Sequence, residues 1–364
     1  MTRLEFGIVG AGWRSEFYLR IARALPERFR VRAMLVRSEE KGNEIEKEWG
    51  VPTYRDMDSF VSGGPYAFVV VSVPWEAAPG CILDLSEKNI PVLTETPPAP
   101  DVPGMIQLYD AVTKRKGRVQ VAEQYIYQPM HAARIALADS GKLGDVSQVQ
   151  VSAAHGYHGI SLIRHLLGIR FENAVIRGQR FTSAIVKGPG RNGLSDAEEM
   201  GVSTQDIVTL QFGDKLALYD FTGDQYHSWI RKNRVLIRGS RGEVTDESYR
   251  YLQDFQTPVY GELRRVDTGH NGNLEGYYHR GIMANDEWLY NNPCVPGRLA
   301  DDEIAIATSL IKMGEYVQGG PSCYDLEEAL QDHYLSMMMQ AAIESGEQVT
   351  TTTQPWAFKR SAGN

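Results

Sequence analysis

Residues 4–15 read LEFGIVGAGWRS and form the most informative stretch of the chain. A short apolar run ends in glycine, and a segment with helical spacing, residues 13–25, follows at once. Gly10 permits a tight turn, and Gly12 lets backbone N–H groups approach a pyrophosphate at the positive end of the helix. Ser15 stands where the dinucleotide-binding fingerprint has its third glycine and is small enough for helix–strand packing. The stretch therefore predicts the first βα unit of a dinucleotide-binding domain.

Strand-like and helix-like segments alternate outward from this stretch as far as residue 122. Residues 67–73, AFVVVSV, are a continuous run of the kind expected for a strand buried on both faces of a parallel sheet. The alternation predicts right-handed βαβ units and an α/β, doubly wound Rossmann domain over residues 1–122. We expect strands at 4–9, 31–36, 67–73, 91–93 and 118–122, and helices at 13–25, 39–49, 76–88 and 102–116.

Beyond residue 122 the pattern changes to strands joined by glycine-containing turns. It predicts a second, α+β domain over residues 123–364, built on a large, mostly antiparallel sheet. A chain of 364 residues is long enough for about two domains at roughly 150 residues each. We expect strands at 146–153, 174–181, 207–212, 216–221, 234–238 and 243–249, long loops at 187–204 and 254–275, and helices at 131–140, 160–167, 300–318 and 326–345.

Composition excludes several classes of protein. Acidic residues outnumber basic ones, 46 to 38, so we expect no general affinity for nucleic acid or anionic membranes. No apolar stretch approaches the roughly 20 residues needed to span a bilayer, and Glu5 falls where a signal peptide would be apolar. Cys81, Cys294 and Cys323 are widely spaced, which argues against disulfides and favours the cytoplasm. His, Asp and Glu residues are scattered without metal-ligand spacing, so we expect no metal.

The choice between NAD and NADP depends on the end of the second predicted strand. Arg37 and Ser38 occupy the place where an acidic residue would hold the ribose 2′-hydroxyl of NAD. Arginine with serine suits the 2′-phosphate of NADP, whereas Arg37 stacked on adenine, with Ser38 or Glu39 at the ribose, suits NAD. A solvated arginine on a surface turn is the third interpretation. We favour NAD and leave NADP open.

Four segments together resemble the glucose-fructose oxidoreductase, inositol dehydrogenase and MocA (Gfo/Idh/MocA) family. They are GIVGAG at 7–12, TETP at 94–97 where the family carries Glu-Lys-Pro, SGKLGDV at 140–146, and DE at 302–303 with LEEALQD at 326–332. The resemblance covers nearly the whole chain. It implies a Rossmann domain, a second α/β domain with an open-faced sheet, and NAD(P)-dependent redox chemistry on sugars, polyols or glycosides. It also implies a homo-oligomer formed through that sheet, and some members of the family keep their cofactor tightly bound.

The chain departs from the family where the chemistry is expected. Thr96 replaces the family lysine, and a threonine hydroxyl does not shuttle protons at neutral pH. Ala154 and Ser161 replace two family aspartates, so that only the histidine, His158, remains. Hydride removal from a carbinol leaves a proton for a base, which histidine can accept near pH 7. We predict His158 as that base; an interior histidine that only packs is the alternative.

Tyrosines are candidates to replace the lysine. Tyr125 and Tyr127 follow the last predicted Rossmann strand, and strand-like alternation would put them on one face with Glu123. A tyrosine ladder that only packs is the alternative. The predicted catalytic residues are His158, Tyr125 and Tyr127. The predicted cofactor contacts are Gly10, Gly12, Trp13, Arg14, Arg37, Ser38, Ser72, Pro74, Trp75, Glu95, Thr96 and Gln124, and the predicted substrate contacts are His155, Tyr157, Tyr226, Trp229, Tyr277 and His279.

These features predict an NAD(P)-dependent oxidoreductase that oxidises a secondary hydroxyl of a sugar or glycoside, or runs the reverse reaction. Oxidation at the 3-hydroxyl of a glucoside is the variant favoured by the tyrosine-rich crevice. A small-polyol, inositol-like dehydrogenase is one alternative. A catalytically inactive nucleotide- or sugar-binding protein of the same fold is the other, because Thr96 and Ala154 are both departures from the family's chemistry.

Overall fold

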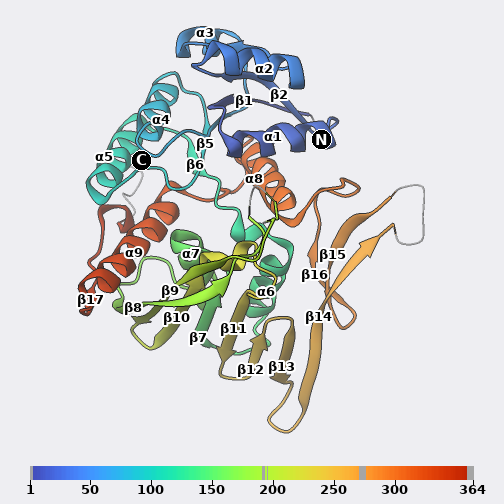
Figure 1. Cartoon of the computed structure of the whole chain (residues 1–364), viewed down its shortest axis with the longest axis vertical. Coiled ribbons are helices and arrows are strands. Elements are labelled where there is room, and N and C mark those ends of the chain that lie inside the picture. Colours follow the sequence, from blue (N-terminus) through green and yellow to red (C-terminus); the bar gives the residue numbers. More distant parts are fainter. Residues whose placement is uncertain (1–2, 191–192, 195, 270–275, 359–364) are drawn as a thin grey trace. The chain divides into compact units, whose positions relative to one another are not determined.

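The computed structural model describes residues 3–190, 193–194, 196–269 and 276–358 (Figure 1). The chain divides into two compact units. Unit 1 comprises residues 1–129, 266–281 and 291–330, and unit 2 comprises residues 130–265, 282–290 and 331–364. Residues 291–330 therefore belong to unit 1, although the sequence pattern grouped them with the second domain.

Unit 1 contains a six-stranded sheet in the order β3-β2-β1-β4-β5-β6, with every neighbouring pair parallel. This is the doubly wound order of dinucleotide-binding domains, so the predicted fold is confirmed. Its strands are β1 (Leu4–Val9), β2 (Phe29–Leu35), β3 (Thr53–Tyr54), β4 (Val69–Val71), β5 (Val92–Thr94) and β6 (Val119–Val121). Its helices are α1 (Trp13–Ala24), α2 (Glu39–Trp49), α3 (Met57–Ser62), α4 (Ala78–Glu87), α5 (Val102–Arg115) and α8 (Asp301–Val317).

The core of unit 1 follows directly from its apolar strands. All three residues of β4 are completely buried, as are Phe6 and Ile8 on β1. A strand between two parallel neighbours, with helices on both faces, has no solvent-facing side, which explains the continuous apolar run that predicted it.

The sheet of unit 2 has eleven strands in the order β16-β15-β14-β13-β12-β11-β7-β10-β9-β8-β17. Among the pairs whose register is described, β7–β10 is parallel and the others are antiparallel. The strands are β7 (Val146–Ser152), β8 (Val175–Val186), β9 (Met200–Phe212), β10 (Lys215–Thr222), β11 (Arg234–Gly239), β12 (Gly242–Thr245), β13 (Ser248–Leu252), β14 (Pro258–Thr268), β15 (Tyr278–Ala284), β16 (Glu287–Asn291) and β17 (Val349–Thr350). The remaining elements are α6 (Pro129–Asp139), α7 (Gly156–Leu167), α9 (Leu326–Ser345) and the short 3-10 helices η1 (Tyr125–Tyr127), η2 (Gly223–Tyr226) and η3 (Pro355–Ala357).

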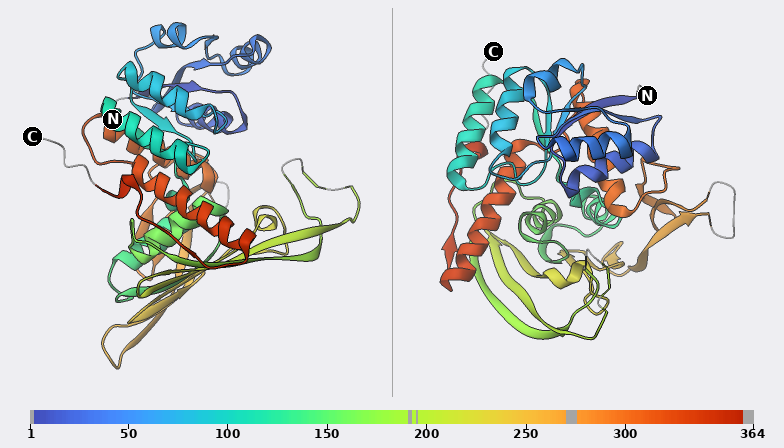
Figure 2. Two further views of the ribbon diagram at one scale, coloured as in Figure 1. Left: turned by 90° about the vertical axis from the view of Figure 1, so that its left-hand side faces the viewer. Right: turned by 45° about the horizontal axis from the view of Figure 1, so that its top comes forward.

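Helices cover only one face of this sheet. Figure 2 shows α7 and α9 on one side, and no helix of the described residues on the other. On the covered side β7 buries Val149 and Val151 completely. The predicted open-faced, mostly antiparallel sheet is confirmed.

Three local predictions were wrong. Residues 243–249 are two strands, β12 and β13, because the chain reverses at Asp246, which has φ 56°. The loops predicted at 187–204 and 254–275 contain the start of β9 and the whole of β14. The tyrosines at 125 and 127 lie in η1 rather than on a strand, where the Glu123 carboxylate accepts the N–H of Tyr125 at 2.9 Å.

Candidate functional site

The glycine turn of unit 1 has the geometry that a dinucleotide requires. Gly10 has φ +112°, and a Cβ atom there would overlap the carbonyl oxygen of Ser72 on the neighbouring strand connection. Gly12 is the N-cap of α1, and a Cβ there would meet nothing within 4 Å. No side chain of the described residues caps α1 at this end. The turn is therefore tight on one side and open above the positive helix end, where a pyrophosphate fits.

An ion-pair cluster joins α1 to the carboxyl ends of β5 and β6. Arg14 Nε lies 3.3 Å from Glu95 Oε2, and the Tyr18 hydroxyl also donates to Glu95. Gln124, with its amide turned to match its neighbours, accepts from Arg14 Nη2 at 2.6 Å and donates to the carbonyl of Ala122 at 2.9 Å. Burial alone would lower the pKa of Arg14, but the Glu95 carboxylate together with Tyr18, Asp302 and Tyr125 outweighs burial, so that the pKa is raised. Three predicted cofactor contacts, Arg14, Glu95 and Gln124, thus form one network.

The other predicted cofactor residues lie at the same end of the parallel sheet. Trp13 and Trp75 are 54% and 46% exposed, so both rings are accessible. Ser72 is buried and its N–H donates to the carbonyl of Val9 at 2.8 Å. Pro74 is exposed, whereas Thr96 is half-buried.

The end of β2 shows how the ribose region is built. The Ser38 hydroxyl accepts the backbone N–H of Lys41 at 3.2 Å and caps α2. Glu39 and Glu40 are exposed in the first turn of α2, and Arg37 is exposed just before it. The capping role of Ser38 was not predicted, although serine followed by acidic residues in the first helical turn is a usual signal for a helix start.

Tyr127 is engaged within unit 1. Its hydroxyl donates to the carbonyl of Cys323 at 2.5 Å, and burial raises its pKa well above the usual value. Tyr125 is half-buried in the same short helix. The hydroxyl of Tyr127 is thus better suited to holding structure than to moving protons near neutral pH.

Unit 2 carries a cluster of aromatic rings at the first turn of α7. The backbone N–H of His155 donates to the Tyr226 hydroxyl at 3.0 Å, and His155 Nδ1 lies 2.5 Å from the same oxygen. The ring of His155 lies 5.2 Å from that of Tyr157 and 4.9 Å from that of His158, and these last two rings are 4.5 Å apart. Tyr157 also contacts the ring of His333 on α9 at 5.7 Å. The structure thus brings together four of the predicted site residues.

The members of this cluster differ in their solvent exposure. His155 is exposed and Tyr226 is 39% exposed, whereas His158 is only 4% exposed. Trp229, in the segment after η2, is 80% exposed. The accessible part of the cluster therefore consists of His155, Tyr226 and the nearby tryptophan segment.

Glycines let the cluster form. Gly156 has φ +41°, and a Cβ at Gly159 would overlap the ring of Tyr219 and approach the carbonyl of Ala154. The Tyr219 hydroxyl accepts the N–H of Gly156 at 2.9 Å. The first turn of α7 thus packs directly onto β10.

The remaining predicted substrate residues form a separate group in unit 1. Asp267 accepts from the Tyr277 hydroxyl at 3.0 Å, and its other carboxylate oxygen lies 2.8 Å from His279 Nδ1. His279 is buried, whereas Tyr277 is 52% exposed. Asp267 was not predicted, because it meets these two residues only when β14 and β15 are neighbours in the sheet.

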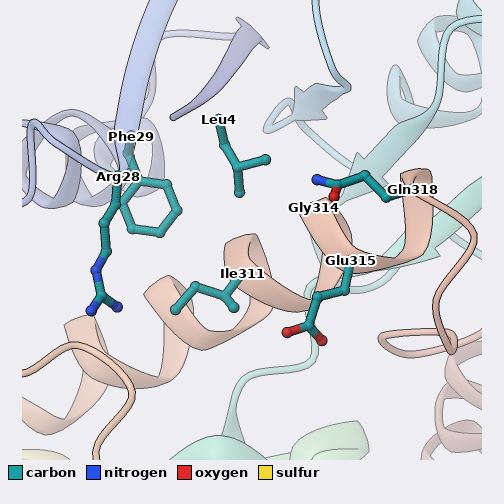
Figure 3. Close-up of a pocket in the computed structure, with 7 residues that line it drawn as sticks. All are labelled: Leu4, Arg28, Phe29, Ile311, Gly314, Glu315 and Gln318. Carbon is teal, nitrogen blue, oxygen red and sulfur yellow. The ribbon is translucent and has the colours of Figure 1, made fainter. Parts of the chain in front are cut away.

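A pocket of about 140 Å³ lies at the opposite end of the unit 1 sheet. Its walls are the first residues of β1 and β2, Leu4 and Phe29, together with Ile311 and Gly314 of α8 and Gln318 at its C-cap (Figure 3). Ligands of doubly wound sheets bind at the carboxyl ends of the strands, so this pocket is not the cofactor site.

Membrane-spanning helices and metal-binding clusters are both absent from the described residues. None of their helices has both the length and the apolar character to cross a membrane. No group of three His, Cys, Asp or Glu side chains among them lies where it could hold a metal ion.

The geometry defines a dinucleotide-binding Rossmann domain followed by an open-sheet α/β domain. Residues 4–123 match the family described as oxidoreductase family, NAD-binding Rossmann fold (Gfo/Idh/MocA). The predicted resemblance and the predicted cofactor, NAD, are thereby confirmed. No curated protein sequence matches the chain.

Solved structures share the fold over nearly the whole chain. An oxidoreductase from Agrobacterium radiobacter in complex with NAD+, L-tartaric acid and magnesium is 14% identical, with a TM-score of 0.66, over 96% of this chain and 98% of that one. The apo scyllo-inositol dehydrogenase from Lactobacillus casei is 15% identical, with a TM-score of 0.64, over 96% and 98%. The WlbA dehydrogenase from Chromobacterium violaceum in complex with NADH and UDP-GlcNAcA is 14% identical, with a TM-score of 0.63, over 97% of both chains.

Proposed function

We propose that the protein oxidises a secondary hydroxyl of a sugar, polyol or glycoside with NAD, or catalyses the reverse reduction. The observation that carries the proposal is the cluster of His155, Tyr157, His158 and Tyr226 at the start of α7. It combines rings that can stack on a sugar's apolar face with groups that can exchange a proton. An NAD-binding domain on the same chain makes hydride transfer the reaction such a site would serve.

We assign cofactor binding to residues of unit 1 and substrate binding to residues of unit 2. In unit 1 the Gly10–Gly12 turn binds the pyrophosphate, and the Arg14–Glu95 pair shapes the carboxyl end of the sheet. When bound, NAD supplies a nicotinamide that accepts a hydride. In unit 2 the His155 cluster holds the sugar and takes the hydroxyl proton. Thr96 stands where the family has its lysine, and we assign the lysine's proton-transfer role to groups of this cluster.

We assign a glycoside, oxidised at its 3-hydroxyl, as the preferred substrate, and an inositol-like polyol as the alternative. Tyr226 beside His155 and Trp229, three residues further along the chain, offer exposed aromatic surface, which suits a substrate with a bulky apolar aglycone. A dehydrogenase crystallised with a sugar derivative, WlbA with UDP-GlcNAcA, shares the fold.

We further propose that two copies associate through the uncovered face of the unit 2 sheet, in the cytoplasm. On that face Leu216 is 39% exposed and Phe181 is 56% exposed. Apolar side chains on a helix-free sheet face are the usual mark of a subunit contact.

The test is a turnover assay of the full chain with NAD and a panel of glucosides, free sugars and inositols. Reduced nicotinamide absorbance, or a keto-sugar product detected by mass spectrometry if the cofactor is retained, is expected with at least one glycoside. His158→Asn in the same assay reports on the predicted base. Measurable NAD binding with no product across the whole panel would instead favour the binding-protein alternative, which Thr96 and Ala154 motivate.

A further inference from the structure

The hydrogen bonds of Tyr226 distinguish it from the other tyrosines of the cluster. Its hydroxyl oxygen accepts the backbone N–H of His155 at 3.0 Å, while His155 Nδ1 lies 2.5 Å away. A hydroxyl that accepts one N–H has its own proton to donate to a second partner. In the tautomer of His155 with Nδ1 unprotonated, Nδ1 is that second partner, and the phenol proton then lies on a short bond to a nitrogen base.

Tyr219 provides an internal comparison. It also accepts a backbone N–H from the first turn of α7, that of Gly156, at 2.9 Å. It is only 3% exposed, and burial raises its pKa well above the usual value. Both tyrosines therefore cap α7, but only Tyr226 combines this with an imidazole contact and access to solvent.

His155 is also better placed than His158 to serve as a base. His155 is exposed, whereas His158 is 4% exposed, with its ring against those of His155 and Tyr157. Desolvation disfavours the imidazolium form of a buried histidine, and a substrate hydroxyl must reach the base that it protonates.

The 3-10 helix η2 fixes Tyr226 in place. The Thr222 N–H donates to Gln225 Oε1 at 3.0 Å, as part of a capping box. The amide nitrogen of Gln225 donates to the carbonyl of Ser152 at 2.7 Å and to that of Lys232 at 3.0 Å. Because Ser152 ends β7 three residues before His155, η2 and the start of α7 are tied together. Such a rigid setting is what proton transfer requires.

We propose that Tyr226 and His155 are the proton-transfer pair of this enzyme, an inference that rests on the proposed function. In oxidation, the substrate hydroxyl proton moves to Tyr226 Oη as the phenol proton moves to His155 Nδ1. The carbinol C–H bond breaks with its electron pair, which leaves as hydride to NAD, and the C=O bond forms. The backbone N–H at the positive end of α7 stabilises charge that develops on Oη. The His155 imidazolium then releases the proton to solvent.

The experiment compares four variants of the full chain on the sugar that the wild type turns over best. Tyr226→Phe and His155→Asn remove the pair, Tyr219→Phe is the matched control for α7 capping, and His158→Asn tests the competing base. Turnover, the Kd for NAD and the melting temperature are measured for each. ¹⁵N-histidine NMR of wild type and Tyr226→Phe reports directly on the bond at His155 Nδ1, without any turnover.

We expect Tyr226→Phe and His155→Asn each to lower kcat by about 100- to 10,000-fold, the usual range for general acid–base groups, with NAD affinity unchanged. Tyr219→Phe should stay within about threefold of wild type at permissive temperature, and the Nδ1 signal of His155 should shift in Tyr226→Phe. If the wild type is active, two results would overturn the assignment of this pair. One is an equal loss of kcat in Tyr226→Phe and Tyr219→Phe, and the other is a loss of kcat confined to His158→Asn. A wild type inactive on every sugar would overturn the proposed function, and the pair with it.

Discussion

An added methyl group should mainly lower stability at Gly10 and mainly weaken NAD binding at Gly12, the two glycines of the nucleotide turn. In Gly10→Ala the residue must keep φ +112°, which costs roughly 1–2 kcal/mol for a residue with a Cβ. Its Cβ would also overlap the backbone of Ser72, and relieving such overpacking costs about 1–3 kcal/mol. The sum, about 2–5 kcal/mol, lowers Tm by roughly 4–20 °C, because each kcal/mol is worth about 2–4 °C in a domain of this size.

In Gly12→Ala the fold should be nearly unaffected. The methyl enters open space on extended backbone, so the cost is at most about 1 kcal/mol for a changed N-cap. That space is where the pyrophosphate approaches the start of α1. Losing one charge-assisted hydrogen bond there, worth about 1.5–3 kcal/mol, weakens NAD binding by about 10- to 100-fold.

Differential scanning fluorimetry and isothermal titration with NAD measure both effects. Gly10→Ala should show the large Tm loss, and Gly12→Ala the large affinity loss at nearly normal Tm. A Gly12→Ala variant that binds NAD as tightly as wild type would show that the pyrophosphate does not lie against this turn.

Three further outcomes follow from single contacts. Arg164 and Asp332 form an ion pair at 2.6 Å, and their side chains are 1% and 3% exposed. Arg164→Met should therefore lower the free energy of unfolding by about 3–5 kcal/mol, measured by urea denaturation, and the second change Asp332→Leu should recover part of that loss. Burial lowers the pKa of His131 to about 3, below its unfolded value of about 6.5. The contribution of His131 to stability is therefore complete above pH 6.5 and falls by up to about 1.4 kcal/mol per pH unit as the pH drops toward 3. His131→Gln, which keeps an acceptor for Arg134, should make the stability depend less on pH in that window. Tyr127→Phe should cost about 1 kcal/mol of stability by urea denaturation and leave kcat within about twofold, whereas a large loss of kcat would restore the predicted catalytic role.

The Rossmann half of the fold was readable from the sequence because its strands are buried on both faces. A continuous apolar run such as Val69–Val71 is typical of a strand in the interior of a parallel sheet, and Gly10 and Gly12 mark the turn after the first strand. The strand β14 was missed for the opposite reason. Exposed positions alternate with half-buried ones along its first seven residues, but only Leu263 is buried, so Pro258–Thr268 has too little apolar character to stand out from a loop.

The candidate site was only partly readable. The sequence indicated His155, His158 and Tyr226 separately, but nothing in it showed that Tyr226 contacts His155, because 71 residues separate them. Tyr127 was misjudged as strand-borne because the strand β6 ends at Val121 and the chain then forms the 3-10 helix η1. Contacts between distant segments decide these roles, and local pattern does not contain them.

Deuterium transfer tests the central claim most directly. The full chain is incubated with NAD and a glucoside deuterated at the carbinol carbon, and the nicotinamide is recovered and analysed by mass spectrometry. We predict deuterium on the reduced nicotinamide and a keto group at the labelled carbon, even if the cofactor never leaves the protein. NAD bound without any deuterium on its nicotinamide, across glucosides, free sugars and inositols, would contradict the assignment of the protein as an oxidoreductase.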